Sequence, residues 1–128
     1  MAIDCIAEIP GAVELSNWFG GFPSFIDAKA EFQINSDGTG WLRASSFRMS
    51  DWVDAEGFPV MEKRFVALFH FSEIKSVSIT DFMPGHVILD ELDIKKTDSA
   101  IQINFFDTAW GAAGCIEAKS VRIEFEPV

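Results

Sequence analysis

The sequence contains no tyrosine, only two cysteines and two histidines, and half as many basic as acidic residues (10 against 20). Its rings belong to 13 phenylalanines and 4 tryptophans, so they carry no hydroxyl group and most are expected in the core. Cys5 and Cys115 lie near opposite ends of the chain and outside any CxxC spacing. This favours separate thiols over a disulfide and gives no support to a zinc or redox site. His70 and His86 have no cysteine or serine nucleophile beside them, so we expect His70 within a sheet and His86 near the surface.

Several other sequence features are also missing. No apolar run approaches the roughly 20 residues that cross a bilayer, and residues 1–4 lack the basic stretch of a secretory signal, so we expect a cytoplasmic protein. No GxGxxG, GxxxxGK[ST] or GxSxG motif occurs. Because no nucleophile, base and orienting group can be named together, we expect neither catalysis nor a cofactor.

The excess of acidic residues leaves a net charge of −10 at pH 7. Such a surface repels phosphate backbones and anionic membranes, which disfavours nucleic acid and membrane as partners. It attracts a basic protein and accelerates association with it at low salt. The same charge also serves solubility alone, and composition does not separate the two explanations.

Acidic residues also cluster at Asp90, Glu91 and Asp93. Side chains in a strand alternate between faces, so we expect Glu91 and Asp93 to share a solvated face and Asp90 to share the other with Leu92. One strand face supplies too few oxygens for a calcium site, so no metal is expected.

The length of 128 residues fits one domain, over residues 1–128, and no repeat or linker divides it. Apolar periodicity and turn residues predict one helix followed by strands. We expect the helix over residues 11–19 and strands over residues 27–35, 41–49, 62–71, 73–81, 86–96, 100–107 and 115–126. For residues 1–8 the sequence is consistent with either a short edge strand or a loose arm.

The connections between these strands are mostly too short for a parallel crossover. Asp37-Gly38 marks a hairpin turn, and residues 50–59 form a long polar connection. Slips of the apolar alternation at Ser45-Ser46 and near Lys119-Ser120 predict β-bulges. We therefore predict an α+β, mostly β fold, with one curved antiparallel sheet of about seven strands and a short N-terminal helix packed on it.

Residues 18–28 (WFGGFPSFIDA) contain four aromatic rings around two glycines and a proline. Glycine tolerates positive φ, so Gly20-Gly21 can end the helix, and Pro23 then restricts the chain direction. We expect Asp27 to accept hydrogen bonds from nearby backbone. The residues given a structural role at this joint between helix and sheet are Trp18, Phe19, Gly20, Phe22, Pro23, Phe25 and Asp27.

This motif resembles the immunity protein 50 family of bacterial polymorphic-toxin systems. The family pattern is aromatic-Phe-Gly-x-aromatic-Pro-Ser-Phe-His-Asp-Ala, followed by an alternating strand. The similarity continues more weakly at residues 69–71, at residues 77–82 and in the small-residue loop before the last strand. Ile26 stands where the family has histidine. This chain therefore has no imidazole at that position for a role such as metal ligation beside Asp27. The resemblance implies a non-catalytic inhibitor that binds and neutralises a toxin domain encoded nearby.

The leading hypothesis is therefore an immunity protein whose acidic surface masks a cognate toxin domain, with a basic nuclease as one candidate. An aromatic residue within an acidic loop can anchor an interface while the charges steer the partner. The alternative arrangement, in which Trp52 and Phe58 pack back onto the sheet, is equally open. The predicted toxin-binding residues are Asp51, Trp52, Asp54, Glu56, Phe58, Glu91 and Asp93.

Two other functions compete with this hypothesis. A carrier of a small apolar ligand would enclose a cavity lined by Phe32, Phe65, Phe69 and Phe105. An enzyme would place Asp27 with a histidine, a second carboxylate or a metal in a cleft. The oligomeric state cannot be inferred from the sequence.

Overall fold

The computed structural model describes residues 8–81, 87–107 and 111–128, without the side chains of residues 49–52 and 59–61. The expectations for residues 1–7 and for His86 lie outside this part of the chain. The elements are α1 (Ala12–Phe19), β1 (Lys29–Ile34), β2 (Gly40–Val53), β3 (Pro59–Thr80), β4 (Glu91–Lys96), β5 (Ile101–Asp107) and β6 (Ala112–Pro127).

The strands form one antiparallel sheet in the order β1-β2-β3-β6-β5-β4. The predicted architecture is confirmed, with six strands in the sheet where about seven were expected. The predicted strands over residues 62–71 and 73–81 are one continuous strand, β3. Glu73 has a left-handed φ of 53°, and the β3–β6 register shifts between Ile74 and Ser76. The chain therefore turns sharply at this point without leaving the sheet.

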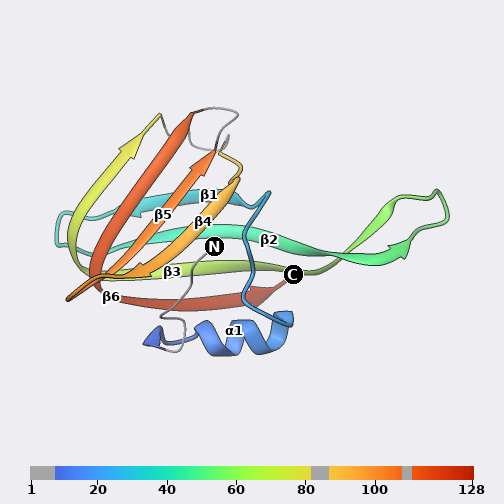
Figure 1. Cartoon of the computed structure of the whole chain (residues 1–128), viewed down its shortest axis with the longest axis horizontal. Coiled ribbons are helices and arrows are strands. Elements are labelled where there is room, and N and C mark those ends of the chain that lie inside the picture. Colours follow the sequence, from blue (N-terminus) through green and yellow to red (C-terminus); the bar gives the residue numbers. More distant parts are fainter. Residues whose placement is uncertain (1–7, 82–86, 108–110) are drawn as a thin grey trace.

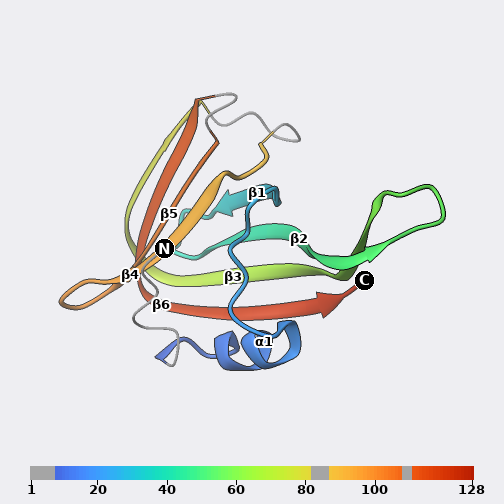
Figure 2. The ribbon, with the colours of Figure 1, turned by 45° about the vertical axis from the view of Figure 1, so that its right-hand side comes forward.

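The sheet is strongly bent, and β3 and β6 pass through both of its halves (Figures 1 and 2). One half contains β1, β2, the first part of β3 and the last part of β6. The other half contains the end of β3, the start of β6, β5 and β4. Buried residues of β6 alternate up to Ala118 and resume out of phase at Val121, so the predicted slip at Lys119-Ser120 is confirmed in the burial pattern. The accompanying register shift lies in the partner strand β3.

The predicted bulge near Ser45-Ser46 is also confirmed, at the pairs Ser46–Phe65 and Arg48–Glu62. Between these pairs β3 advances by three residues while β2 advances by two, so the extra residue belongs to β3. Lys63, which lies in this interval, has a left-handed φ of 48°.

The prediction for residues 50–59 is wrong in form. β2 continues to Val53 and β3 starts at Pro59, so half of the expected connection is strand, and residues 54–58 between the two strands form the turn. The predicted strand over residues 86–96 is shorter, because β4 starts at Glu91. The preceding segment forms an isolated bridge at Ile88 with Lys29 and so ties β1 to the chain that enters β4.

The core lies inside the bend of the sheet and is filled by large side chains. Phe25, Phe65, Phe69 and Phe105 are each at most 2% exposed. Helix α1 lies beside β6, with Ala12 and Leu15 buried against the sheet (Figure 1). Gly20 ends α1 with a left-handed φ of 90°, as predicted, and its N–H donates to Ser16 O at 2.9 Å.

Candidate functional site

The structure places the predicted contact residues 51–58 at the end of a protruding hairpin. We call residues 49–61 the β2–β3 arm. Among the described strands, β1 pairs only with residues 40–45 of β2, and β6 pairs with β3 only from Phe65 onward. The arm therefore has no other described strand beside it, and it extends beyond the rest of the sheet (Figure 1).

The tip of the β2–β3 arm is a turn organised by Asp54. One carboxylate oxygen of Asp54, Oδ1, accepts hydrogen bonds from the backbone N–H groups of Glu56 at 2.9 Å and Phe58 at 3.0 Å. Gly57 supplies the left-handed residue, with a φ of 87°. Asp54 thus has a structural role in addition to its negative charge.

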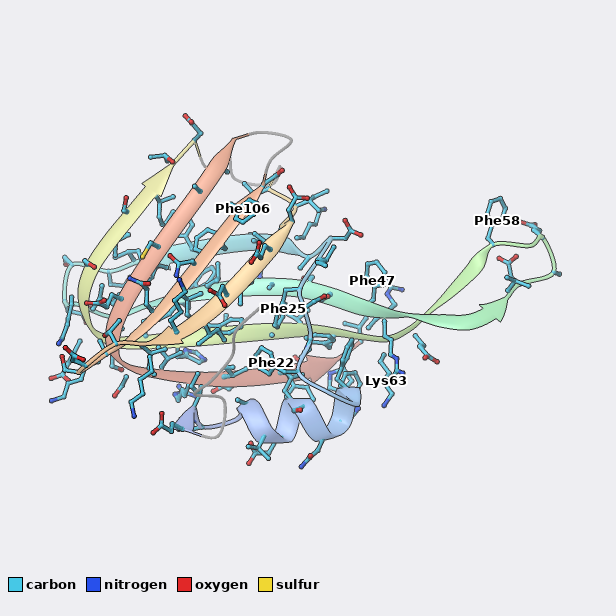
Figure 3. The ribbon with its side chains drawn as sticks, viewed as in Figure 1. Phe22, Phe25, Phe47, Phe58, Lys63 and Phe106 are labelled. Atoms are coloured by element: carbon cyan, nitrogen blue, oxygen red, sulfur yellow. The ribbon has the colours of Figure 1, made fainter. Side chains whose placement is uncertain are left out.

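Beside this turn, the arm exposes apolar side chains. Phe58 is 62% exposed and Val53 is 63% exposed, which is unusual for large apolar groups placed so close together. Figure 3 shows Phe58 at the end of the arm, away from the body of the protein. Of the two arrangements left open for Phe58, the structure shows the exposed one. The side chains of Asp51 and Trp52 lie outside the described part of the chain.

The base of the arm is attached to the C-terminus of α1 by two cations. Arg48 donates a hydrogen bond to Phe19 O at 3.1 Å, and Lys63 donates one to Trp18 O. The Lys63 ammonium also lies 5.4 Å from the centroid of the Trp18 ring. Positive charge at the last turn of a helix stabilises its unpaired carbonyl groups and its dipole. These contacts hold the start of the arm against the helix.

Arg48 and Lys63 were not predicted as functional residues. The available signal was their position as cations on both sides of an acidic segment. Their partners lie 29 and 45 residues away in the sequence, so local patterns did not reveal them.

The aromatic residues of the motif at 18–28 lie against the sheet. Phe25 is buried and makes edge-on contacts with Phe65 and Phe69, at 5.9 and 5.6 Å between ring centroids. Trp18 contacts Phe65 at 5.8 Å, and Phe22 contacts Phe25 at 5.9 Å. Phe19 also contacts Phe65, and Pro23 is buried. The rings therefore pack the joint between the helix and the sheet.

Asp27 forms its hydrogen bond differently from the expectation. Its carboxylate is exposed and, among the described residues, accepts no backbone hydrogen bond. Instead its backbone N–H donates to Leu89 O at 2.8 Å, in a residue with a left-handed φ of 65°. The residue thus helps to connect the chain before β1 to the segment before β4.

Glu91 and Asp93 lie in β4 and are half-buried, while Leu92 and Ile94 face the core. The alternation over residues 91–94 is confirmed. Asp90 does not share the buried face of Leu92 as predicted, because it precedes β4 and is exposed. Asp93 has one oxygen 3.8 Å from Lys95 Nζ and another that is buried without a hydrogen bond from any described residue. The β4 strand belongs to the body, so the structure does not bring these two acids to the tip of the arm (Figure 1).

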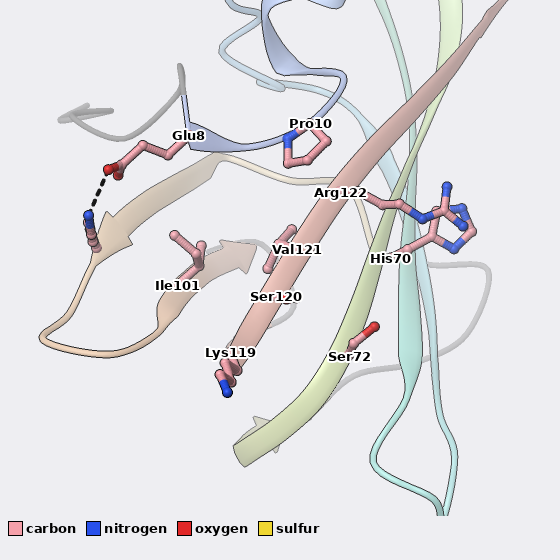
Figure 4. Close-up of a pocket in the computed structure, with 10 residues that line it drawn as sticks. Glu8, Pro10, His70, Ser72, Ile101, Lys119, Ser120, Val121 and Arg122 are labelled. Atoms are coloured by element: carbon pink, nitrogen blue, oxygen red, sulfur yellow. Dashed lines mark hydrogen bonds and ion pairs between the residues drawn. The ribbon is translucent and has the colours of Figure 1, made fainter.

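A concavity of about 470 Å³ lies between the start of the described chain, the β4–β5 turn and the bend of β6 (Figure 4). Several of its cations are neutralised within the chain. Lys96 contacts Glu8 at 2.7 Å, and Arg122 and His70 both contact Glu124. The hydrogen bond from Arg122, followed by the charge of His70, lowers the pKa of Glu124.

Cys115 is a free, half-buried thiol in β6. Burial raises its pKa, which makes it a poor nucleophile at neutral pH. Among the described residues, no group of three His, Cys, Asp or Glu side chains could hold a metal ion. Within the same residues, no helix is long and apolar enough to cross a membrane.

No protein-family model, curated protein or solved structure matches the chain. The resemblance at residues 18–28 therefore stays a prediction that rests on the motif alone. Function has to be inferred from the geometry of the arm and from the charge of the chain.

Proposed function

We propose that this chain is an immunity protein that binds and neutralises a basic bacterial toxin domain without catalysis. The single observation that carries the proposal is the tip of the β2–β3 arm. It combines an exposed phenylalanine and an exposed valine with carboxylates at the end of a projecting hairpin.

The arm has the composition of an interface anchor. Aromatic side chains dominate binding energy when a partner desolvates them, and surrounding polar groups exclude water from the contact. Phe58 has no core to fill at its position, so its exposed area is available to a partner. The bonds of Asp54 to the turn hold the hairpin in shape before binding, which reduces the entropy lost on association.

Charge supports a basic partner over an acidic or neutral one. The chain has a net charge of −10, and Asp51, Asp54 and Glu56 all belong to the arm. Long-range attraction between opposite charges raises association rates and declines as salt screens it. A toxin that acts on nucleic acid carries the positive surface that this field would attract.

The carrier hypothesis has less support from the packing of the core. Phe65, Phe69 and Phe105 are buried and packed, with Phe69 and Phe65 both in contact with the Phe25 ring. The described part of the chain has surface concavities of about 470, 350 and 480 Å³. Phe65 lines the second of these, and Phe32, Phe69 and Phe105 line none of the three. A carrier would need space among these rings.

Co-expression with the toxin domain encoded beside the gene tests the proposal. We expect rescue of growth and co-purification of the two proteins. If the chain neither restores growth nor co-purifies with that domain, the immunity function is wrong.

Phe58→Ala should weaken binding of the toxin domain at least tenfold, about 1.4 kcal/mol, because it removes the exposed anchor of the arm. Isothermal titration calorimetry with purified proteins measures the loss. Phe106→Ala is the matched control, because Phe106 is a partly exposed phenylalanine on β5 in the body (Figure 3). Equal losses for both variants would remove the arm from the interface.

Glu56→Lys should slow association with the toxin domain severalfold at low salt and much less at about 0.5 M salt. Glu56 is exposed at the tip, so the change reverses charge without removing a side-chain contact of the turn. Glu14→Lys is the matched control, because it makes the same change of net charge at an exposed position of α1. Stopped-flow association rates that fall equally for both variants would show that only the net charge matters, and not the arm.

A further inference from the structure

The second half of β3 is an open edge of the sheet. Its pairing with β2 ends at Phe71, where the chain bends, while its pairing with β6 continues to Thr80. Within the part of the chain that the structure describes, residues 76–80 have a strand neighbour only on the β6 side. The remaining backbone donors and acceptors of this segment are available to another strand.

Residues 76–80 (SVSIT) lack the features that usually protect such an edge. The segment contains no charge and no proline, and three of its five residues are β-branched. Val77 is 39% exposed and Ile79 is half-buried, so an apolar strip accompanies the free backbone. The unpaired backbone groups and the apolar side chains of residues 76–80 therefore favour the addition of a further strand at this edge.

The sequence of the edge is complementary to itself in the antiparallel direction. With Ser78 opposite Ser78 of a second copy, Val77 faces Ile79 of that copy and Ser76 faces Thr80. The regular part of the segment ends on both sides of these pairs, because Lys75 lies at the shift of the β3–β6 register and Asp81 follows β3 with a left-handed φ of 53°. Aliphatic and hydroxyl groups are thus matched within residues 76–80.

We propose that two copies of this chain pair antiparallel through residues 76–80 of β3, around a two-fold axis at Ser78. The two sheets then form one continuous sheet.

The dimer leaves the β2–β3 arm free, because the arm and the edge lie on opposite sides of the molecule (Figure 1). An edge of five residues buries less than the roughly 1,200 Å² of a stable standard interface, so dissociation should be measurable at micromolar concentrations. The dimer does not depend on the proposed toxin binding.

Sedimentation equilibrium of the purified chain tests the dimer at about 0.15 M salt, where the Debye length of about 8 Å screens repulsion between the two acidic copies. We expect a concentration-dependent shift from monomer to dimer. Val77→Lys adds a charge to the edge and should weaken dimerisation at least tenfold. Val13→Lys places the same change at an exposed valine of α1 and should leave dimerisation unchanged.

Circular dichroism checks that each variant is folded. A chain that stays monomeric to millimolar concentration, or a dimer that Val77→Lys does not affect, would overturn the proposal.

Discussion

Replacing Phe25 with alanine should lower the free energy of unfolding by about 3–5 kcal/mol. Phe25 is 1% exposed and lies where the chain between α1 and β1 meets the sheet. Its ring contacts Phe65 and Phe69 of β3 and also Phe22. Removal leaves a cavity among rigid rings that cannot collapse to fill it, so the loss should be near the upper end for a core substitution.

Urea denaturation followed by tryptophan fluorescence measures the effect of Phe25→Ala. Phe58→Ala removes the same atoms from a site that is 62% exposed, and its unfolding free energy should stay within about 0.5 kcal/mol of the wild type. The two variants therefore distinguish the structural role of the Phe25 ring from the proposed binding role of the Phe58 ring. A loss below about 1 kcal/mol for Phe25→Ala would mean that the motif at residues 18–28 does not pack the core as described.

Gly11→Ala should also destabilise the fold strongly. Gly11 precedes α1 with a left-handed φ of 88°, and a Cβ atom added there would lie 1.8 Å from the backbone oxygen of Ile123 in β6. The chain cannot simply move away, because Ile123 N–H donates to Pro10 O at 2.8 Å. We expect a cost of about 1–2 kcal/mol from the backbone conformation and about 1–3 kcal/mol more from the overlap.

Gly57→Ala is the matched control for Gly11→Ala. Gly57 has nearly the same φ, 87°, but a Cβ atom added there meets nothing within 4 Å. Gly57→Ala should therefore lose only the conformational part of the unfolding free energy. Urea denaturation measures the unfolding free energies of both variants, and their difference isolates the cost of the overlap between the start of α1 and β6. Equal losses would show that the close approach of Gly11 to Ile123 relaxes without cost.

The predicted binding residues divide into those that sequence patterns could reveal and those that they could not. The acidic and aromatic composition of residues 50–58 indicated a contact segment. The shape of that segment depends on the pairing of β2 with β3 beyond Arg48–Glu62, and this pairing is a tertiary property. Glu91 and Asp93 share a strand face as predicted, but the fold places that strand in the body and not beside the arm.

Local patterns were sufficient for most elements. The alternation over residues 27–35 predicted β1, Asp37-Gly38 predicted the first hairpin, and Gly20 predicted the end of α1, because each depends on the conformational preferences of a few adjacent residues. The number of strands was misjudged for the opposite reason. Glu73 and the register shift after it bend β3, and only the continuous pairing with β6 keeps the two segments in one strand.

Sequence patterns alone were thus enough to establish most of the strands, the antiparallel sheet, the acidic charge and the aromatic joint between helix and sheet. The packed fold was needed to show that the acidic connection becomes a projecting arm, that Phe58 is exposed at its tip, and that Arg48 and Lys63 attach its base to α1. The physical reason is distance along the chain. Strand pairing and helix-end contacts join residues whose separation leaves no periodic signal, so their positions follow from tertiary packing and not from neighbouring residues.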